Sequence, residues 1–467
     1  MPISQILLIH SFIVGLLLAF WLIKLHRRGL FRWTTAGFWA WAAFALYFVF
    51  NPLLSALAGD YLWYEITLSI AEGDRRAIWI GFVICVGIST FFSVYVRTPT
   101  HKITWGLKHP TRFPPTVWYF VLACIALGLP SLVTYRIGLF GGGASVALDQ
   151  GRFVGNVTGY EYSAHAFLLV ASVFLILAAP KLGRVSGWAI LFTYVVASFA
   201  DPWSRFLGVS SLLAMAIIDT MRRSKPWPRA LIIVAAIFVG TVLWQRGHTT
   251  FNSGTEFWTT ASQAPATVID TIASSDAAML ATFYLESYTK DTLGGFDYGI
   301  PIINYSITGL LPSKYFPWKY SLIDSLRARQ NPQIGSTLLG LLSGGKSTLI
   351  GSFYAEGGLI GVILLTILAG YLSRKLDCMI DRDSPQLVRA TGIVWMSLLW
   401  MVWGSADYWA LTQLGMVALP TIGIWLLSPK ASHSSRRRWQ QRAQGYRPPA
   451  APPLPSIGMF GPGDARE

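Results

Sequence analysis

The sequence predicts an all-α integral membrane protein, a polytopic bundle of helices, and three observations support this fold class. Of the 467 residues, 53% are hydrophobic and only 13% are charged, which lies outside the range of water-soluble globular domains. Apolar runs close to the roughly 20 residues that a helix needs to cross a bilayer repeat along the chain. Helices also satisfy every backbone polar group inside the membrane, which an open sheet does not.

The apolar runs give about eleven candidate spans. They cover residues 5–23, 35–57, 77–96, 116–135, 164–179, 187–200, 206–221, 230–244, 348–372, 390–403 and 410–427. The first run continues into "WLIKLHRRGLFR" without a small-residue cleavage site, so we expect a retained span rather than a signal peptide. Pro202 separates the sixth and seventh spans and predicts a hairpin that encloses a polar pit. The unrelated spacings of the cysteines predict neither a disulfide framework nor a zinc site: Cys85, Cys124 and Cys378.

The lysines and arginines predict the orientation of the spans, because short basic loops remain in the cytoplasm. Alternate connections between the spans are basic, and with the tail they collect most of the 37 basic residues. We therefore expect the N-terminus outside and the C-terminus inside. The net charge of +15 follows largely from this topology and from attraction to anionic lipids, so it requires no nucleic acid.

We expect one membrane domain over residues 1–430, which includes a long outer loop at 245–347, and a disordered cytoplasmic tail at 431–467. The tail is basic and contains the Pro-rich stretch "YRPPAAPPLP". Semi-apolar segments of the loop, such as "ASSDAAMLATFYL" and "PIINYSITGLLPSKYFPW", predict short helices on or over the bundle. A loop of this length is usually functional or disordered, and this one is too aromatic for disorder. Its aromatic side chains suit sugar rings, and equally suit interfacial anchoring.

The stretch "GLLSGGKST" at 340–348 has the spacing of a nucleotide-binding P-loop. It lies at the end of the outer loop, where ATP is not normally present, and the chain lacks the alternating strands and helices that a P-loop requires. We therefore reject an ATPase. Glycines and Lys346 before a helix N-terminus still suit the phosphate of a lipid. A flexible turn whose Lys346 reaches the lipid head groups explains the stretch equally well.

Ionisable residues near the outer ends of spans are candidates for chemistry, because charges inside a bilayer are costly and commonly functional. Arg205 begins the seventh span, where Asp201 is an alternative, purely structural partner. Glu356 lies two turns inside the ninth span without a basic neighbour in sequence, so it needs a partner from elsewhere or must be protonated. Further candidates are Arg246, His248 and Asp407. Arg136 and Arg152 lie in a Gly-rich outer segment that we expect to close over a substrate. His165 is expected to be a hydrogen-bonded packing residue.

Two segments carry a resemblance to a known family. In "DPWSRFLGVSSLLAMAIIDTMRRSK", a small residue and an arginine open a helix that ends in a basic loop. In "STLIGSFYAEGGLIGVILLTILAGYL", a serine, an acidic residue and glycines follow the large loop that contains "LPSKYFPW". Over residues 204–372 the chain thus resembles the Wzy-type polymerases of O-antigen, capsule and exopolysaccharide repeat units. The related O-antigen ligases share these loose motifs, but the large loop lacks an obvious His–Asn pair, which lowers the ligase interpretation.

The resemblance implies a metal-independent membrane glycosyltransferase of the GT-C kind, without a cofactor, in a bacterial inner membrane. Such an enzyme polymerises oligosaccharide repeat units linked to undecaprenyl pyrophosphate on the periplasmic face, surrounded by membrane lipids. A chain-length regulator and a flippase are candidate partners. Because the leaving pyrophosphate is anionic, the resemblance assigns its neutralisation to Arg205 with Arg246 or Arg152.

The same resemblance assigns the general base to Glu356, with His248 in reserve. An equally defensible role for Glu356 is structural, as the partner of Arg205 or another arginine until substrate arrives. Lys346 and Tyr354 are expected to line the site.

Two rival functions remain. A ligase shares the donor and the arginines and differs in its acceptor. A transporter or flippase belongs to another class and predicts paired half-helices from internal repeats; we find no internal repeat, and the polar candidates crowd the outer third of the bundle.

Overall fold

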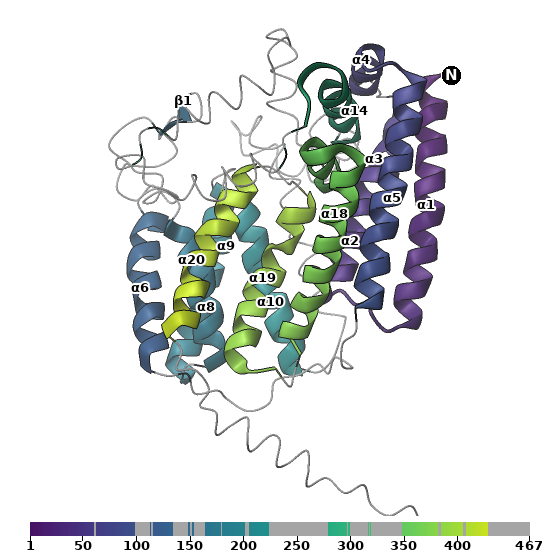
Figure 1. Cartoon of the computed structure of the whole chain (residues 1–467). Helices are drawn as coiled ribbons and strands as arrows, with labels where there is room; N and C mark the ends of the chain where they lie inside the picture. The colour runs from purple at the N-terminus through teal and green to yellow at the C-terminus, as the bar shows by residue number, and fades with distance from the viewer. Residues whose placement is uncertain are drawn as a thin grey trace, which may run out of the picture.

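The structure of the chain is a computed structural model, which describes residues 1–59, 62–98, 113, 115–133, 148–149, 152–153, 164–178, 180–200, 205–223, 279–296, 298, 316, 318, 348–381, 384–404 and 408–427. These residues form a bundle whose helices run roughly side by side (Figure 1). Their β structure is one short antiparallel pair, β1 (Leu148–Asp149) with β2 (Arg152–Phe153). The expected all-α fold class is confirmed for this part of the chain.

In chain order the helices form an N-terminal group, a middle group and a set of C-terminal elements that packs against both (Figure 1). The N-terminal group is α1 (Ile3–Arg27), α2 (Ala36–Ala45), η1 (Leu46–Phe50), α3 (Asn51–Ala58), α4 (Leu62–Ile70) and α5 (Asp74–Arg97). The next group is α6 (Pro115–Ser131), η3 (Ala164–Ala166), α8 (Phe167–Ala178), α9 (Lys181–Ala200) and α10 (Arg205–Arg223). The C-terminal elements are α14 (Met279–Thr289), η6 (Lys290–Gly294), α18 (Leu349–Met379), α19 (Gln386–Gly404) and α20 (Tyr408–Leu427). Helix α18 joins the groups, since it packs against both α5 and α19.

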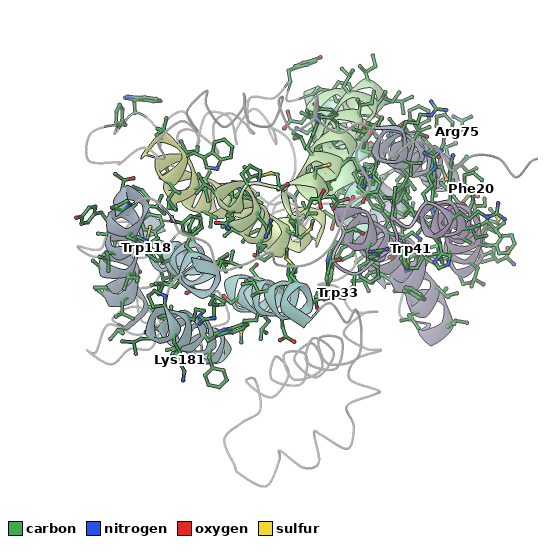
Figure 2. All side chains as sticks on the ribbon, turned by 90° about the horizontal axis from the view of Figure 1, so that it is seen from below. Phe20, Trp33, Trp41, Arg75, Trp118 and Lys181 are labelled. Carbon is green, nitrogen blue, oxygen red and sulfur yellow. The ribbon has the colours of Figure 1, made fainter. Side chains whose placement is uncertain are left out.

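The length and composition of the helices are those of a membrane protein. Four described helices are long and apolar enough to cross a membrane: Ile3–Arg27, Ala36–Leu57, Asp74–Arg97 and Leu349–Met379. Shorter apolar helices are Pro115–Ser131, Ala164–Leu177, Ser210–Met221, Gln386–Leu399 and Val417–Leu426. Large apolar side chains are exposed, among them Phe12 and Phe20. Phe20 lies on the periphery, where a bilayer would contact it (Figure 2).

The span count of about eleven is not confirmed by these helices. The predicted span at 230–244, the break at Pro202 and the tail at 431–467 lie outside the described residues. Helix α4 was not expected, whereas α14 begins inside the segment 273–285 that was expected to form a short helix and extends four residues beyond it.

Contacts at both ends of α1 and α5 define the direction of the bundle. The Met1 ammonium lies 2.9 Å from Asp74 Oδ2, and Arg28 Nη1 donates to the Val96 carbonyl at 3.0 Å. The two helices therefore run in the same direction, and we refer to the Met1 end as the upper end and the Arg28 end as the lower end, as in Figure 1. Arg374 also belongs to the lower end, because its guanidinium lies over the Tyr95 ring. Basic residues that were expected to share one side of the membrane do share one end here.

A buried carboxylate ties three helices together at the lower end. Asp377 of α18 is fully buried. It accepts hydrogen bonds from the Ala36 N–H at 2.8 Å and from the Tyr95 hydroxyl, and it forms an ion pair with Arg374 at 3.5 Å. The Ala36 N–H belongs to the first turn of α2, where the backbone has no intrahelical acceptor and a negative charge is favourable. Close contact depends on Gly370, because a Cβ there would lie 2.6 Å from the Phe91 carbonyl oxygen.

Replacing this carboxylate should destabilise the bundle. Asp377→Ala removes the acceptor of the Tyr95 hydroxyl and of the Ala36 N–H and breaks the ion pair with Arg374. Truncating one partner of a buried ion pair costs about 3–5 kcal/mol. We expect a clearly lower melting temperature for the purified variant in detergent. Asp74→Ala is the matched control, because it breaks an exposed ion pair worth at most about 1 kcal/mol. Equal melting temperatures of the two variants would contradict the role given to Asp377.

Candidate functional site

Helix α18 is interrupted by two glycines and is not one continuous helix. Gly357 has φ −174° and ψ 31°, and Gly358 has φ 61° and ψ −145°, neither of which is helical. The positive φ of Gly358 lies in a region that residues with a Cβ rarely adopt. The first piece, 349–356, begins at Thr348, whose hydroxyl accepts the Gly351 N–H at 3.0 Å. The second piece covers residues 359–379.

The two pieces of α18 fold back on each other. Tyr354 is hydrogen-bonded to Trp79 near the upper end of α5, whereas Ile350 lies against Gly87, further down the same helix. The piece 349–356 therefore rises along α5. Val362 also lies against Gly87, so the piece 359–379 descends from the same tip to Asp377 and Tyr95 at the lower end.

Close backbone contact between the two pieces confirms this hairpin: a Cβ at Gly361 would lie 2.5 Å from the Phe353 carbonyl oxygen. We refer to residues 349–379 as the α18 hairpin and to Gly357 and Gly358 as its tip. The prediction of one uninterrupted span at 348–372 is wrong in this respect. Glycine has a low helix propensity, and two in succession favour a break that the apolar composition does not reveal.

The hairpin holds Glu356 immediately before its tip, at the upper end of the bundle. Glu356 is 6% exposed, so its carboxylate is largely removed from bulk solvent. Its backbone carbonyl accepts the Tyr298 N–H at 2.9 Å. The Phe296 ring covers Gly358 so closely that a Cβ there would lie 2.9 Å from the ring. Phe296 and Tyr298, from the chain that follows α14 and η6, thus hold the tip in place.

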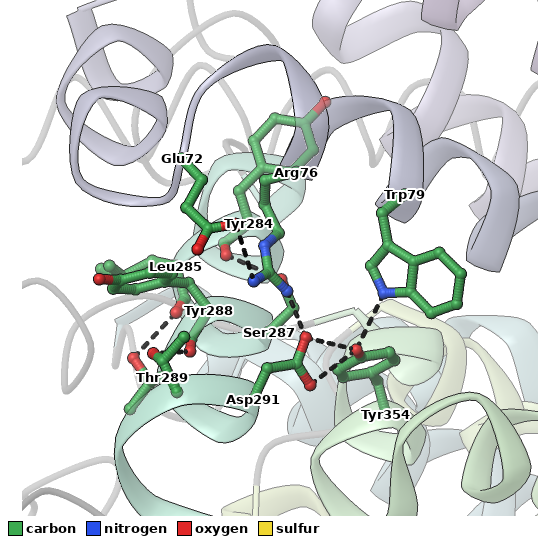
Figure 3. Close-up of polar contacts among 11 residues, drawn as sticks. Glu72, Arg76, Trp79, Tyr284, Leu285, Ser287, Tyr288, Thr289, Asp291 and Tyr354 are labelled. Atoms are coloured by element: carbon green, nitrogen blue, oxygen red, sulfur yellow. Dashed lines mark hydrogen bonds and ion pairs between the residues drawn. The ribbon is translucent and has the colours of Figure 1, made fainter.

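A polar cluster beside the tip joins α5, η6 and the α18 hairpin (Figure 3). Arg76 is 6% exposed; its Nη1 donates to Asp291, and its Nη2 lies 3.8 Å from Glu72 Oε2. The Tyr354 hydroxyl donates to the Asp291 carboxylate, at 2.9 and 2.8 Å from its two oxygens. The same hydroxyl accepts the Trp79 Nε1–H at 3.0 Å. Asp291 therefore connects a buried arginine of α5 to the rising piece of the hairpin.

The cluster fixes the chain segment that covers the tip. Asp291 is held by Arg76 and Tyr354, and only five residues later Phe296 contacts Gly358. Both ends of this short segment thus contact the α18 hairpin directly, and Arg76 also attaches Asp291 to α5. The arrangement keeps the Glu356 carboxylate at a defined position near the upper surface of the bundle.

Two tyrosines behind the cluster are held in their neutral form. The Tyr64 hydroxyl donates to Asn51 Oδ1 at 2.6 Å, and its ring contacts the ring of Tyr284 edge to face. Burial raises the pKa of Tyr284, and burial together with the neighbouring Tyr284 raises the pKa of Tyr64 well above its usual value. Neither tyrosine is therefore suited to act as a base near neutral pH.

Two of the predicted site residues, Tyr354 and Glu356, lie on the rising piece of the hairpin, where residues two positions apart point to different faces of the helix. Arg205 is the first residue of α10, and Arg152 lies in β2. The remaining predicted residues lie outside the part of the chain that the structure describes: Arg136, Arg246, His248, Lys346, Asp201 and Asp407. His165 is fully buried, which fits the expected packing role, and its backbone N–H donates to Ser131 Oγ at 3.1 Å.

Sequence reasoning missed Arg76, Asp291 and Trp79. Arg75 and Arg76 together did carry a signal, because they are basic residues at the sparsely charged end of the third predicted span. Asp291 carried none, since its partner Arg76 lies 215 residues away in sequence. Among the described residues, no group of three His, Cys, Asp or Glu side chains could hold a metal ion.

Comparisons with protein-family models, curated proteins and solved structures found no match to this chain. The family resemblance of residues 204–372 therefore stays a prediction, and the geometry of the tip is the main structural guide to function.

The contact between Phe296 and Gly358 can be tested by adding one methyl group. Gly358→Ala places a Cβ both in a strained backbone conformation and 2.9 Å from Phe296, so it should displace the segment that covers the tip. Gly73→Ala is a close control, because Gly73 has a similar φ of 59° and ψ of −128° but no contact nearer than 4.0 Å. We expect a larger loss of melting temperature for Gly358→Ala. Equal losses would show that backbone strain alone matters at Gly358.

Proposed function

We propose that the chain is a metal-independent glycosyltransferase that polymerises lipid-linked oligosaccharide repeat units. The observation that carries the proposal is the nearly buried Glu356, which the α18 hairpin holds beside a polar cluster at the upper end of the bundle. The resemblance of residues 204–372 to Wzy-type polymerases supports the same assignment. In this proposal the upper end faces the periplasm of a bacterial inner membrane.

The proposed reaction joins two lipid-linked glycans. A hydroxyl of the incoming repeat unit attacks the anomeric carbon of the growing chain, a new glycosidic bond forms, and the bond to undecaprenyl pyrophosphate breaks. The hydroxyl proton passes to the Glu356 carboxylate, because a carboxylate within hydrogen-bond reach can act as a general base. The electron pair of the broken bond stays on the pyrophosphate, whose charge we assign to Arg205 with Arg246 or Arg152.

A transporter of lipid-linked glycans is the second candidate, because broken helices line substrate pathways in many transporters. The interruption at Gly357 and Gly358 is such a break. The two functions differ in a way that an experiment in detergent separates, since transport requires two compartments and polymerisation requires none. A ligase differs from the polymerase only in transferring the glycan to another lipid acceptor.

The decisive experiment incubates the purified protein with its pyrophosphate-linked repeat unit, with a chelator present and ATP absent. We expect a ladder of glycans on a gel. Glu356→Gln should lower the rate of polymer formation about 10²–10⁴-fold, which is the usual contribution of a general base. Glu65→Gln, the same change at an exposed residue of α4, should leave the rate unchanged.

A folded wild-type protein that forms no ladder from the organism's own substrate would overturn the polymerase proposal. Transfer that appears only after a different lipid acceptor is added would identify a ligase instead. A normal ladder from Glu356→Gln would remove Glu356 from the mechanism while leaving the polymerase in place.

A further inference from the structure

The chain that covers the tip of the α18 hairpin carries an exposed aromatic ring. Tyr298 is 75% exposed, whereas Glu356 is 6% exposed. The backbone N–H of Tyr298 donates to the Glu356 carbonyl oxygen at 2.9 Å, so the backbones of the two residues are in direct contact. An exposed aromatic residue is therefore a direct neighbour of the residue to which we assign the proton transfer.

The ring of Tyr298 is supported by other aromatic side chains. It contacts the Phe296 ring edge to face, with ring centroids 6.3 Å apart. Phe296 contacts Tyr354 in the same way at 6.0 Å, and Tyr354 contacts the fully buried Phe283 at 5.7 Å. Edge-to-face contacts of this kind are favourable in themselves. They form a continuous row from the core of the bundle to the exposed ring of Tyr298.

The backbone of Tyr298 has a conformation that is unusual for a residue with a large side chain. Its φ is 52°, and it is one of two non-glycine residues with a positive φ in the described part of the chain. Such conformations are costly for bulky residues, and they are concentrated at active sites and ligand-binding segments. Because the Tyr298 ring is mostly exposed, its burial offsets little of this cost.

Interfacial anchoring is the alternative role for an exposed tyrosine in a membrane protein. An anchor acts through its affinity for the lipid head groups, and it requires neither a fixed backbone conformation nor a packed support. Tyr298 has both of these features, beside the tip of the hairpin. Contact with a ligand explains them better, because a ring that is fixed before binding loses little entropy when the ligand binds.

We propose that the exposed Tyr298 ring binds a sugar ring of the incoming repeat unit by stacking. The faces of a sugar ring present C–H bonds, which pack on the electron-rich face of an aromatic ring. A sugar stacked there lies next to Glu356, which receives the proton of the attacking hydroxyl in the proposed reaction. The identity of this sugar as the acceptor rests on the proposed function, whereas stacking requires only a sugar ring.

Two substitutions of Tyr298 separate the ring from the backbone. Tyr298→Asn removes the ring, keeps the N–H that binds the Glu356 carbonyl, and introduces a residue that tolerates a positive φ better. Tyr298→Phe keeps the ring. Tyr119→Asn is the matched control, because Tyr119 is 73% exposed on α6, which packs against α8 and α20. We expect all three variants to melt close to the temperature of wild type, so that a loss of binding does not reflect unfolding.

The probe is the oligosaccharide released from the organism's own lipid-linked repeat unit. Its affinity for the protein is measured by saturation-transfer NMR in nanodiscs, since detergents with sugar head groups would compete for the ring. Tyr298→Asn should weaken binding about 10-fold, which is within the range for losing one aromatic ring that stacks on a ligand. Tyr298→Phe and Tyr119→Asn should bind the oligosaccharide as wild type does.

The kinetics of polymer formation give a second readout. In the glycan-ladder assay, Tyr298→Asn should raise the KM for the lipid-linked repeat unit about 10-fold with little change in kcat, because stacking is present both before and during the reaction. This result differs from the one expected for Glu356→Gln, which lowers the rate even when substrate is saturating.

Three outcomes would overturn the proposal. The first is equal affinity of wild type and Tyr298→Asn for the oligosaccharide, and the second is a wild-type protein that does not bind it. The third is an equal loss of binding in Tyr298→Asn and Tyr119→Asn, which would show a general effect of removing exposed tyrosines, as expected of interfacial anchors.

The binding assay and the glycan ladder fail independently. Loss of oligosaccharide binding in Tyr298→Asn, with no ladder from wild type, would uphold the sugar site and overturn the polymerase. A ladder from wild type, with unchanged binding and KM in Tyr298→Asn, would uphold the polymerase and overturn the sugar site.

Discussion

The close packing of α18 against α5 is the constraint on which the rest of the structure depends. Helices in a bilayer gain little from the hydrophobic effect and associate through tight packing and polar contacts. Gly87 and Gly370 bring the two helices together, and polar contacts fix the two ends: Tyr354 with Trp79 above, Asp377 with Tyr95 below. With both ends fixed, the two pieces of α18 keep their register on α5, and Glu356 therefore stays at the upper end of the bundle.

The long apolar helices were predictable, because a continuous apolar run leaves few alternatives in a membrane. The runs at 5–23 and 77–96 correspond to Ile3–Arg27 and Asp74–Arg97, with ends that differ by a few residues. The hairpin was not predictable from composition. Glycine is common in membrane helices, so the sequence "AEGGLIG" is compatible with one continuous span. The turn is revealed by the backbone angles of Gly357 and Gly358 and by the contact of Gly361 with Phe353.

One residue of the candidate site, Glu356, was predictable from its apolar surroundings in the sequence. Glu356 stands out because an acidic residue inside an apolar run is costly. Arg76 and Asp291, which complete the cluster, lie far apart in the chain, and no local pattern connects them. The structure thus shows that Arg76 pairs with Asp291, whereas the sequence alone identifies Glu356 as a residue whose burial needs a chemical explanation.

The hairpin has a consequence for membrane topology. The descending piece, residues 359–379, has 21 residues and is about 31 Å long at 1.5 Å per residue, which matches the apolar thickness of a bilayer. The rising piece is too short to cross, so it adds no crossing and does not change the side on which any later helix emerges. Reporter fusions register only the side of the membrane, and they would therefore map this region as a single span.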